Sequence, residues 1–190
     1  PALMDSINEQ RAGEMAKIIG ESYFYLEKYK ESIPYLERHR DNVKLLSIAD
    51  RYQLAFAYFM NRSYKEAAGL FESISYNNSE ISQSALYHLA DCYMNMGDKN
   101  KARAAFASAA AMDFNQTIQE DALFNYAKAT YELSYSPFNE AIRAFNKYIT
   151  LYPTSKRIDE AYNYLVLAYM NTRNYRMAME ALEKIQEKDR

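Results

Sequence analysis

Apolar and polar residues follow one another along most of this chain with the period of an amphipathic helix. The segment 159–185 shows the pattern most clearly. Leu165 and Tyr169 share one helix face in its first half, and Ala178 and Leu182 share another in its second half. A short polar stretch separates the two halves. The segment therefore predicts two helices joined by a tight turn.

Similar segments recur upstream at a nearly constant spacing. One anchor residue marks the same position of the first helix in each segment: Gly20, Ala55, Ala90, Ala127 and Val166. Successive anchors are 35, 35, 37 and 39 residues apart. A helix hairpin repeated at this spacing is typical of stacked helical repeats. We expect a single array over 1–190, with a leading segment 1–12 and units at about 13–47, 48–82, 83–119, 120–158 and 159–190.

Two local patterns predict where helices of the fourth unit begin. The sequence Thr117-Ile-Gln-Glu120 is a capping box, in which the two side chains satisfy each other's end amides. Ser136 is expected to cap the next helix, with Pro137 at its first position.

Composition agrees with an all-helical chain and narrows its partners. Only four Gly and four Pro occur among 190 residues, and 49% of the residues are apolar. The net charge of −2 gives no basic surface of the kind that binds nucleic acid. No apolar run is long enough to cross a bilayer, so we expect no direct membrane insertion. Because the chain begins at Pro1 rather than Met, we expect it to be a piece of a longer protein.

Residues with chemical potential are few and scattered. Cys92 has no second cysteine and stands at a small-residue position, so we expect an inert core thiol. His39 and His88 lie far apart in register, and we expect structural histidines at the surface or half-buried. Glu120 and Asp121 are neighbours whose side chains point apart on a helix. We therefore predict no catalytic residue, no metal site and no cofactor.

The repeated residues resemble the tetratricopeptide repeat family over about 13–190. The second helices carry its pattern at Tyr29, Ser32 and Leu36; Tyr64, Ala67 and Phe71; Ala102 and Phe106; Phe138, Ala141 and Phe145; and Tyr175, Ala178 and Leu182. The first helices carry it at Tyr23, Tyr58, Tyr93 and Tyr169, with Thr130 in place of the tyrosine in the fourth unit. The resemblance implies an all-α fold, a right-handed superhelix or solenoid of about five hairpins.

A narrower resemblance concerns the joint Leu151-Tyr-Pro-Thr-Ser155 and the helices around it, over 141–185. It is similar to repeats of bacterial cell-envelope proteins, of the outer-membrane assembly lipoprotein and Tol–Pal-associated types. This implies a bacterial protein in the periplasm or at the cell envelope. A cytoplasmic location stays open.

The family resemblance also implies that the first helices line a concave inner wall. That wall is rich in aromatic residues and Met, which suits an extended peptide or an amphipathic helix. Family members that bind chaperone tails hold a carboxylate with a Lys and Asn set, of which only Lys17 is present here. The alternative is that many of the aromatic residues pack against neighbouring repeats. The expected partner-binding residues are Tyr52, Phe56, Phe59, Tyr87, Met94, Phe124 and Tyr131.

The function expected from these residues is that of a non-enzymatic scaffold for protein–protein interaction. Its partner would be a protein or a peptide. Two alternatives stay open. One is a structural spacer that self-associates through the open ends of the array, near Pro1 and Lys184. The other is a regulatory domain of a larger enzyme.

Overall fold

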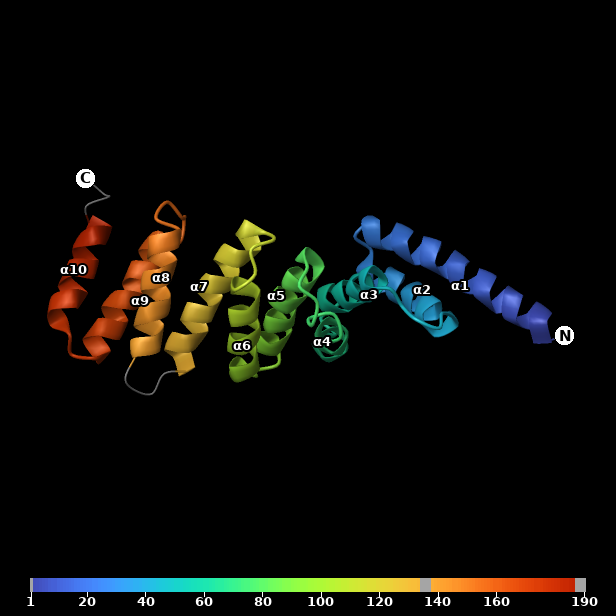
Figure 1. Ribbon diagram of the computed structural model, residues 1–190, viewed down its shortest axis with the longest axis horizontal. Coiled ribbons are helices and arrows are strands. Elements are labelled where there is room, and N and C mark those ends of the chain that lie inside the picture. Colours follow the sequence, from blue (N-terminus) through green and yellow to red (C-terminus); the bar gives the residue numbers. More distant parts are fainter. Residues whose placement is uncertain (1, 134–137, 187–190) are drawn as a thin grey trace. The chain divides into compact units, whose positions relative to one another are not determined.

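The computed structural model describes residues 2–133 and 138–186, and in these ranges the chain forms ten helices and no strand (Figure 1). The expected all-α fold is therefore confirmed. The helices are α1 (Ala2–Tyr25), α2 (Tyr29–Asn42), α3 (Ile48–Met60), α4 (Tyr64–Glu72), α5 (Glu80–Asn95), α6 (Lys99–Ala110), α7 (Gln116–Leu133), α8 (Asn139–Leu151), α9 (Ile158–Asn171) and α10 (Tyr175–Gln186).

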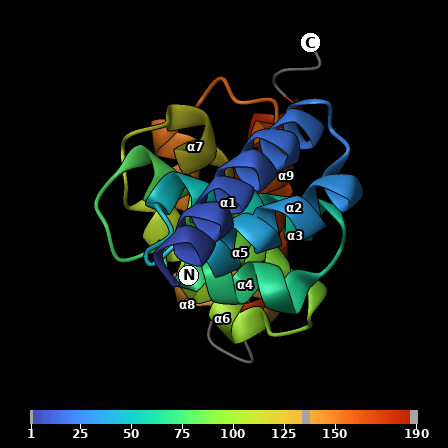
Figure 2. The same cartoon turned by 90° about the vertical axis from the view of Figure 1, so that its right-hand side faces the viewer.

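The helices belong to two compact units, Pro1–Gly97 with α1 to α5 and Asp98–Arg190 with α6 to α10. In unit 1, α1 pairs with α2 and α3 pairs with α4, and the pairs stack through α2 on α3 and α4 on α5. In unit 2, α7 pairs with α8 and α9 with α10, while α6 packs on α7 and α8 on α9. Figure 2 shows α1 and α2 lying side by side. That residues 1–190 form a single array stays a prediction.

The first hairpin is held together by a close approach of its two helices. A Cβ atom at Gly20 would lie 2.8 Å from Cδ2 of Leu36, and one at Gly13 would lie 2.8 Å from Cβ of Asn42. Only glycine leaves room for this contact. The corresponding residue of α3, the anchor Ala55, is fully buried. In the first hairpin, the anchor Gly20 thus marks where the two helices touch.

The tight turns after four of the first helices share one backbone conformation. Glu27, Arg62, Gly97 and Arg173 all have positive φ, between 58° and 80°. Each follows the end of a first helix in the left-handed position that closes it. After α3, for example, the Arg62 amide donates to the Phe59 carbonyl, and the Ser63 amide donates to the Tyr58 carbonyl. The repeat therefore keeps this turn even where the residue is not glycine.

The start of α7 differs from the predicted capping box. The helix begins at Gln116, and the Asn115 side chain accepts the Ile118 amide at 3.1 Å. Thr117 lies inside the first turn, and the Glu120 carboxylate instead accepts the Tyr148 hydroxyl at 3.0 Å. The prediction was wrong because Asn115, two residues earlier, supplies the capping oxygen. The predicted cap at Ser136 and Pro137 lies outside the described residues.

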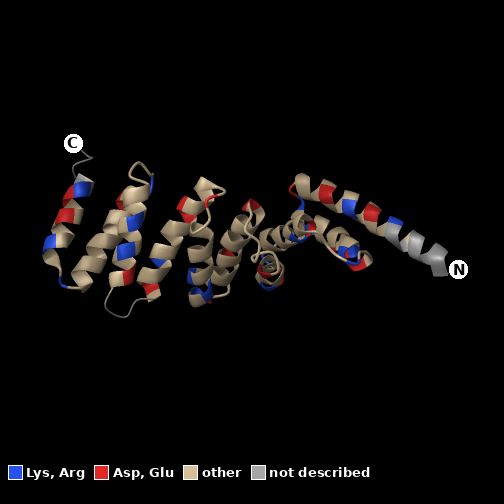
Figure 3. Cartoon of the chain, in the orientation of Figure 1, with Lys and Arg blue, Asp and Glu red and all other residues tan. Residues whose placement is uncertain are grey.

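Charged residues cover the helices without gathering by sign. Figure 3 shows acidic and basic residues interspersed along the helices of each unit. Within the described part of the chain, no helix combines the length and hydrophobicity needed to cross a membrane.

Candidate functional site

An aromatic cluster in unit 1 is centred on α3. Tyr52, Phe56 and Phe59 follow one face of this helix, with ring centroids 6.2 Å and 6.1 Å apart from one residue to the next. Phe24 of α1 lies 5.8 Å from Phe56, and His88 of α5 lies 5.1 Å from it on the other side. Three successive first helices therefore contribute rings to what we call the α3 aromatic cluster.

A hollow of about 290 Å³ opens beside this cluster, between α1 and α3. We call it the α1–α3 hollow. Tyr25 stands at its edge with 78% of its surface exposed, which is unusual for so large an aromatic residue. The hollow thus combines aromatic surface with charged groups. Its lining is Lys17, Glu21, Phe24, Tyr25, Ser47, Ala49, Asp50, Tyr52, Gln53 and Ile81.

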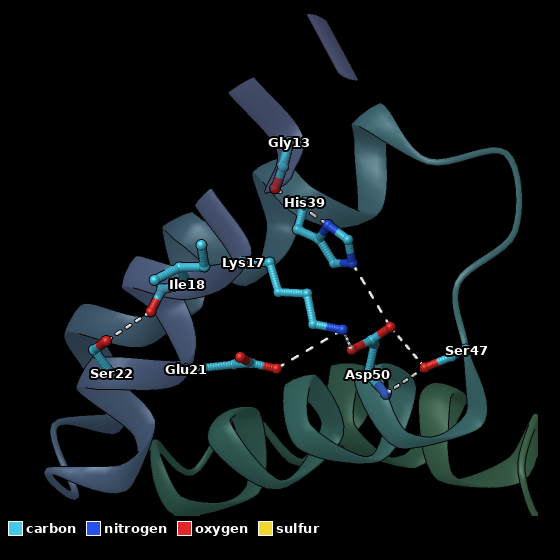
Figure 4. A network of polar contacts seen from close by, with 8 residues as sticks. All are labelled: Gly13, Lys17, Ile18, Glu21, Ser22, His39, Ser47 and Asp50. Carbon is cyan, nitrogen blue, oxygen red and sulfur yellow. Dashed lines mark hydrogen bonds and ion pairs between the residues drawn. The ribbon is translucent and has the colours of Figure 1, made fainter. Parts of the chain in front are cut away.

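The charged part of the hollow is a polar network that joins α1 to α3 (Figure 4). Lys17 Nζ lies 2.5 Å from Asp50 Oδ1 and 3.8 Å from Glu21 Oε1. Ser47 Oγ donates to Asp50 Oδ2 at 2.6 Å and accepts the Asp50 amide at 3.0 Å. Ser47 is therefore the N-cap of α3, and Asp50 is held from two directions.

These contacts shift the pKa values of the ion pair in opposite directions. The hydrogen bond that Lys17 donates to Asp50 is the largest influence on Lys17 and raises the pKa of its ammonium. For Asp50, burial is the largest influence and raises the pKa, but the hydrogen bonds from Lys17 and Ser47 outweigh it. The net pKa of the Asp50 carboxyl is lowered. Both shifts favour the charged pair at neutral pH.

His39 closes the network from α2. Its Nδ1 lies 3.2 Å from the carbonyl oxygen of Gly13, and its Nε2 lies 3.6 Å from Asp50 Oδ2. The ring is buried, so the expectation of a surface or half-buried histidine was wrong. The reason is that Gly13 lets α1 come close enough for its backbone to meet the imidazole. His39 thus ties α1, α2 and α3 together.

His88 has the opposite surroundings, because aromatic rings enclose it. Its ring centroid lies 5.2 Å from Phe59 and 5.7 Å from Phe71, and its Nδ1 is buried without a hydrogen-bond partner. Burial lowers the pKa of the imidazole to about 4. His88 is therefore neutral at physiological pH, as expected of a half-buried structural residue.

The seven predicted partner-binding residues divide between the two units. Tyr52, Phe56 and Phe59 lie together in the α3 aromatic cluster. Tyr87 lies beside His88, at 5.6 Å between ring centroids, and Met94 is exposed near the end of α5.

The other two predicted partner-binding residues, Phe124 and Tyr131, lie in unit 2. Tyr131 contacts Tyr164 at 5.3 Å. Phe124 is only 2% exposed and packs on Phe145 and Tyr148, so it offers a partner almost no surface. The expectation for Phe124 failed because its ring fills the core between α7 and α8.

Sequence reasoning missed the polar network and a second recurring contact. The network was visible as Ser47-Ile-Ala-Asp50, a serine followed three residues later by a carboxylate. The second contact joins hairpins: the Tyr58 hydroxyl donates to Glu37, and the Tyr93 hydroxyl donates to Glu72. Each tyrosine stands 21 residues after its glutamate, which is the signal that could have revealed the pair.

The cysteine of this chain lies outside the hollow. Cys92 is fully buried, and burial raises the pKa of its thiol to about 12, which agrees with an inert core residue. Among the described residues, no group of three or more His, Cys, Asp or Glu side chains could hold a metal ion.

Part of this chain matches the sequence model of a known protein family. A model of the tetratricopeptide repeat family matches residues 84–111 and 121–155. No curated protein sequence matches this chain. The narrower resemblance to cell-envelope proteins stays a prediction.

Several solved structures share the fold. MamA is 19% identical, with 90% of this chain and 94% of that chain covered and a TM-score of 0.71. YrrB, described as a tetratricopeptide repeat protein with an unusual peptide-binding site, is 16% identical, with 98% and 92% covered and a TM-score of 0.72. The repeats of a putative kinesin light chain from Podosopora anserina are 17% identical, with 94% and 95% covered and a TM-score of 0.61. The fold is therefore of the tetratricopeptide type.

Proposed function

We propose that this chain is a non-enzymatic interaction module that binds an extended peptide segment at the α1–α3 hollow. The observation that carries the proposal is the exposure of Tyr25 beside Phe24 and Tyr52, around a built polar network. Exposed aromatic side chains provide large contact area at a small loss of conformational freedom. The hollow therefore has the composition of a recognition site rather than of ordinary surface.

The charges of the hollow indicate which peptides suit it. Lys17 is already paired with Asp50 and Glu21, so these three side chains carry one net negative charge. A peptide carboxylate would meet that negative charge, whereas a Lys or Arg side chain would be attracted to it. We infer that the preferred ligand has an apolar or aromatic anchor next to a basic residue.

Within the predicted binding set, the roles differ. Tyr52 lines the hollow and would contact the peptide. Phe56 and Phe59 lie behind it in the aromatic cluster and would keep Tyr52 in place. Roles for Tyr87, Met94 and Tyr131 stay predictions. The peptide-binding site named for YrrB belongs to that protein, and it supports the proposal only as an example of the fold in such a role.

A random-peptide display selection on this chain tests the proposal. Peptides that are selected are then measured by isothermal titration against the wild type, Tyr25→Ala and Tyr52→Ala. The matched control is Tyr76→Ala, since Tyr76 is 88% exposed in the connection between α4 and α5, outside the hollow. We expect at least a tenfold loss of affinity in the two hollow variants and no change in the control, because an aromatic anchor contributes at least about 1.4 kcal/mol.

Two results would contradict the proposal. The first is a selection that yields no binding peptide. The second is binding that Tyr25→Ala and Tyr52→Ala leave unchanged, or that Tyr76→Ala weakens as much. Circular dichroism of each variant separates loss of the contact from loss of the fold.

A further inference from the structure

One face of α1 is apolar and uncovered. Met15, Ile18 and Ile19 are spaced three and four residues apart and therefore share this face. All three are exposed, and Ile18 exposes 65% of its surface. The opposite face, with Gly13 and Gly20, packs on α2. We call the uncovered side the α1 face.

The repeat shows what covers this face elsewhere in the chain. Ile19 stands at the position that Leu54 has in α3, Leu89 in α5 and Leu165 in α9, and all three leucines are buried. Each of those helices packs on the second helix of the preceding hairpin, α3 on α2, α5 on α4 and α9 on α8. The α1 face is therefore shaped to receive a second helix.

The last helix has the complementary uncovered side, which we call the α10 face. Leu182 of α10 exposes 43% of its surface, whereas Leu36, Phe71 and Phe145 at the same position of earlier second helices are buried. Met179, one turn earlier, is also exposed. Phe71 contacts α5 and Phe145 contacts α9, in each case the next first helix. The α10 face is therefore shaped to receive a first helix.

Two template contacts show how such faces meet. Phe71 stacks on His88 at 5.7 Å between ring centroids, and Phe145 stacks on Tyr164 at 5.0 Å. In the repeat register, Leu182 stands where these phenylalanines stand, and Ile18 stands where His88 and Tyr164 stand. We call this contact between a second helix and the next first helix the joint. An aliphatic pair would thus replace an aromatic pair at the same joint.

A hydrogen bond between successive hairpins recurs at the same repeat register. Tyr58 donates to Glu37 and Tyr93 donates to Glu72 across successive joints. Tyr23 precedes Tyr58 by one period of 35 residues, and Glu183 follows Leu182 as Glu37 follows Leu36. Among the described residues neither Tyr23 nor Glu183 has a side-chain hydrogen-bond partner. One end of the chain thus carries the donor and the other end the acceptor.

We propose that this chain associates with itself head to tail, with the α10 face of one copy stacked on the α1 face of the next. Leu182 packs against Ile18, and the Tyr23 hydroxyl donates to Glu183 of the neighbouring copy. A second copy is the occupant because the chain itself carries both halves of this joint, the apolar contact and the hydrogen bond. The contact is heterologous, since the two copies contribute different surfaces.

Sedimentation velocity of the 190-residue chain over a range of concentrations tests the proposal. Ile18→Asp disables the α1 face and Leu182→Asp the α10 face. Leu45→Asp is the matched control, because Leu45 is 83% exposed between α2 and α3, outside both faces. We expect the wild type and Leu45→Asp to associate alike. Each face variant should associate at least about a hundredfold more weakly, because an unpaired carboxylate would be buried.

Mixing the two face variants gives the sharpest readout. Ile18→Asp keeps an intact α10 face, and Leu182→Asp keeps an intact α1 face. Equal amounts should form a one-to-one dimer and nothing larger, although each variant alone stays monomeric. A symmetric contact of one face with itself would instead leave one variant associating alone and the mixture unchanged, which would overturn the proposal.

A milder variant tests the register. Tyr23→Phe removes only the hydroxyl and should weaken association about tenfold, because a hydrogen bond to a carboxylate is lost. Association that Tyr23→Phe leaves unchanged would show that the register is wrong. A wild type that stays monomeric at every concentration would overturn the proposal and leave both faces to a further hairpin or another protein. Melting curves verify that each variant is folded.

Discussion

Helices α5 and α9 place different residues at the same register position, His88 in unit 1 and Tyr164 in unit 2. Each ring stacks on a phenylalanine of the preceding second helix, with interplanar angles of 29° for His88 on Phe71 and 6° for Tyr164 on Phe145. The repeat therefore conserves the stacking of two rings at the joint, whereas the side chain that stacks on the phenylalanine differs.

The difference changes how each joint responds to its surroundings. His88 brings a buried nitrogen without a hydrogen-bond partner into the packing of unit 1, and its burial lowers the pKa of the imidazole to about 4. Tyr164 places a phenol ring at the position where unit 1 has an imidazole. We therefore expect acid to weaken the packing around His88 in unit 1 more than the packing around Tyr164 in unit 2.

The largest effect is expected from removing the phenylalanine that both joints share. Phe71→Ala in unit 1 and Phe145→Ala in unit 2 should each lower the free energy of unfolding by about 3–5 kcal/mol, because both rings are fully buried and leave cavities. Urea unfolding followed by circular dichroism measures the loss. Hydrogen exchange shows which helices lose protection. A loss below about 1 kcal/mol for either variant would mean that its joint is not packed as described.

The second-largest effect is expected from acidification, which should destabilise the joint at His88 more than the joint at Tyr164. The lowered pKa of His88 means that the unfolded chain binds more protons than the folded chain between pH 6.5 and about 4. Stability is therefore fully present above pH 6.5 and falls by roughly 3 kcal/mol as the pH decreases to about 4. His88→Phe should remove this fall and, by replacing an unpaired nitrogen, stabilise unit 1 at neutral pH by about 1 kcal/mol. Unfolding curves at several pH values measure both effects.

The reciprocal exchange is the control for the pH effect. Tyr164→His should introduce acid sensitivity into unit 2, because the new imidazole would enter a similar aromatic site. Wild type and His88→Phe that lose stability in parallel below pH 6.5 would contradict the role of His88.

The Lys17–Asp50 pair should contribute less, and in another pH range. Asp50→Asn is expected to lower the free energy of unfolding by about 1–2 kcal/mol, since Lys17 is partly exposed and screened by water. The lowered pKa of Asp50 makes its contribution present above its ordinary value of 3.8 and lost as the pH falls below that value. The difference between wild type and Asp50→Asn should therefore persist at pH 5 and disappear in stronger acid. A difference that persists there would exclude the charge as its cause.

The smallest effects concern the hairpin turns. Arg62→Gly should raise the free energy of unfolding by about 0.5 kcal/mol, because Arg62 has a φ of 63° that glycine adopts without strain. Gly97→Ala should lower it by about 1 kcal/mol, since the φ of Gly97 is 80°. Thermal melts of the two variants should therefore shift in opposite directions. Melting temperatures that shift in the same direction would contradict the role of the left-handed backbone conformation at these turns.

The sequence predicted the regular part of the fold well, because helix periodicity and the spacing of small anchors report local geometry. Gly20, one of the anchors, lies at a close approach that Leu36 completes. The burial of Phe124 and His39 was not predictable in the same way. Both depend on contacts between the two helices of one hairpin, with Phe145 for Phe124 and with Gly13 for His39. A residue at an inward position of the repeat is exposed or covered according to the size of its neighbours, which periodicity does not encode.

The spacing between Glu37 and Tyr58 determines whether this contact survives the loss or gain of one repeat. The next pair, Glu72 and Tyr93, lies one period of 35 residues further along. If residues 38–72 were deleted, Tyr93 would stand 21 residues after Glu37, where Tyr58 stands now. The shortened chain would rejoin at a matched donor and acceptor. Gene duplication or loss of this period therefore leaves the tyrosine and glutamate matched, so unit 1 can gain or lose a hairpin without redesign of this contact.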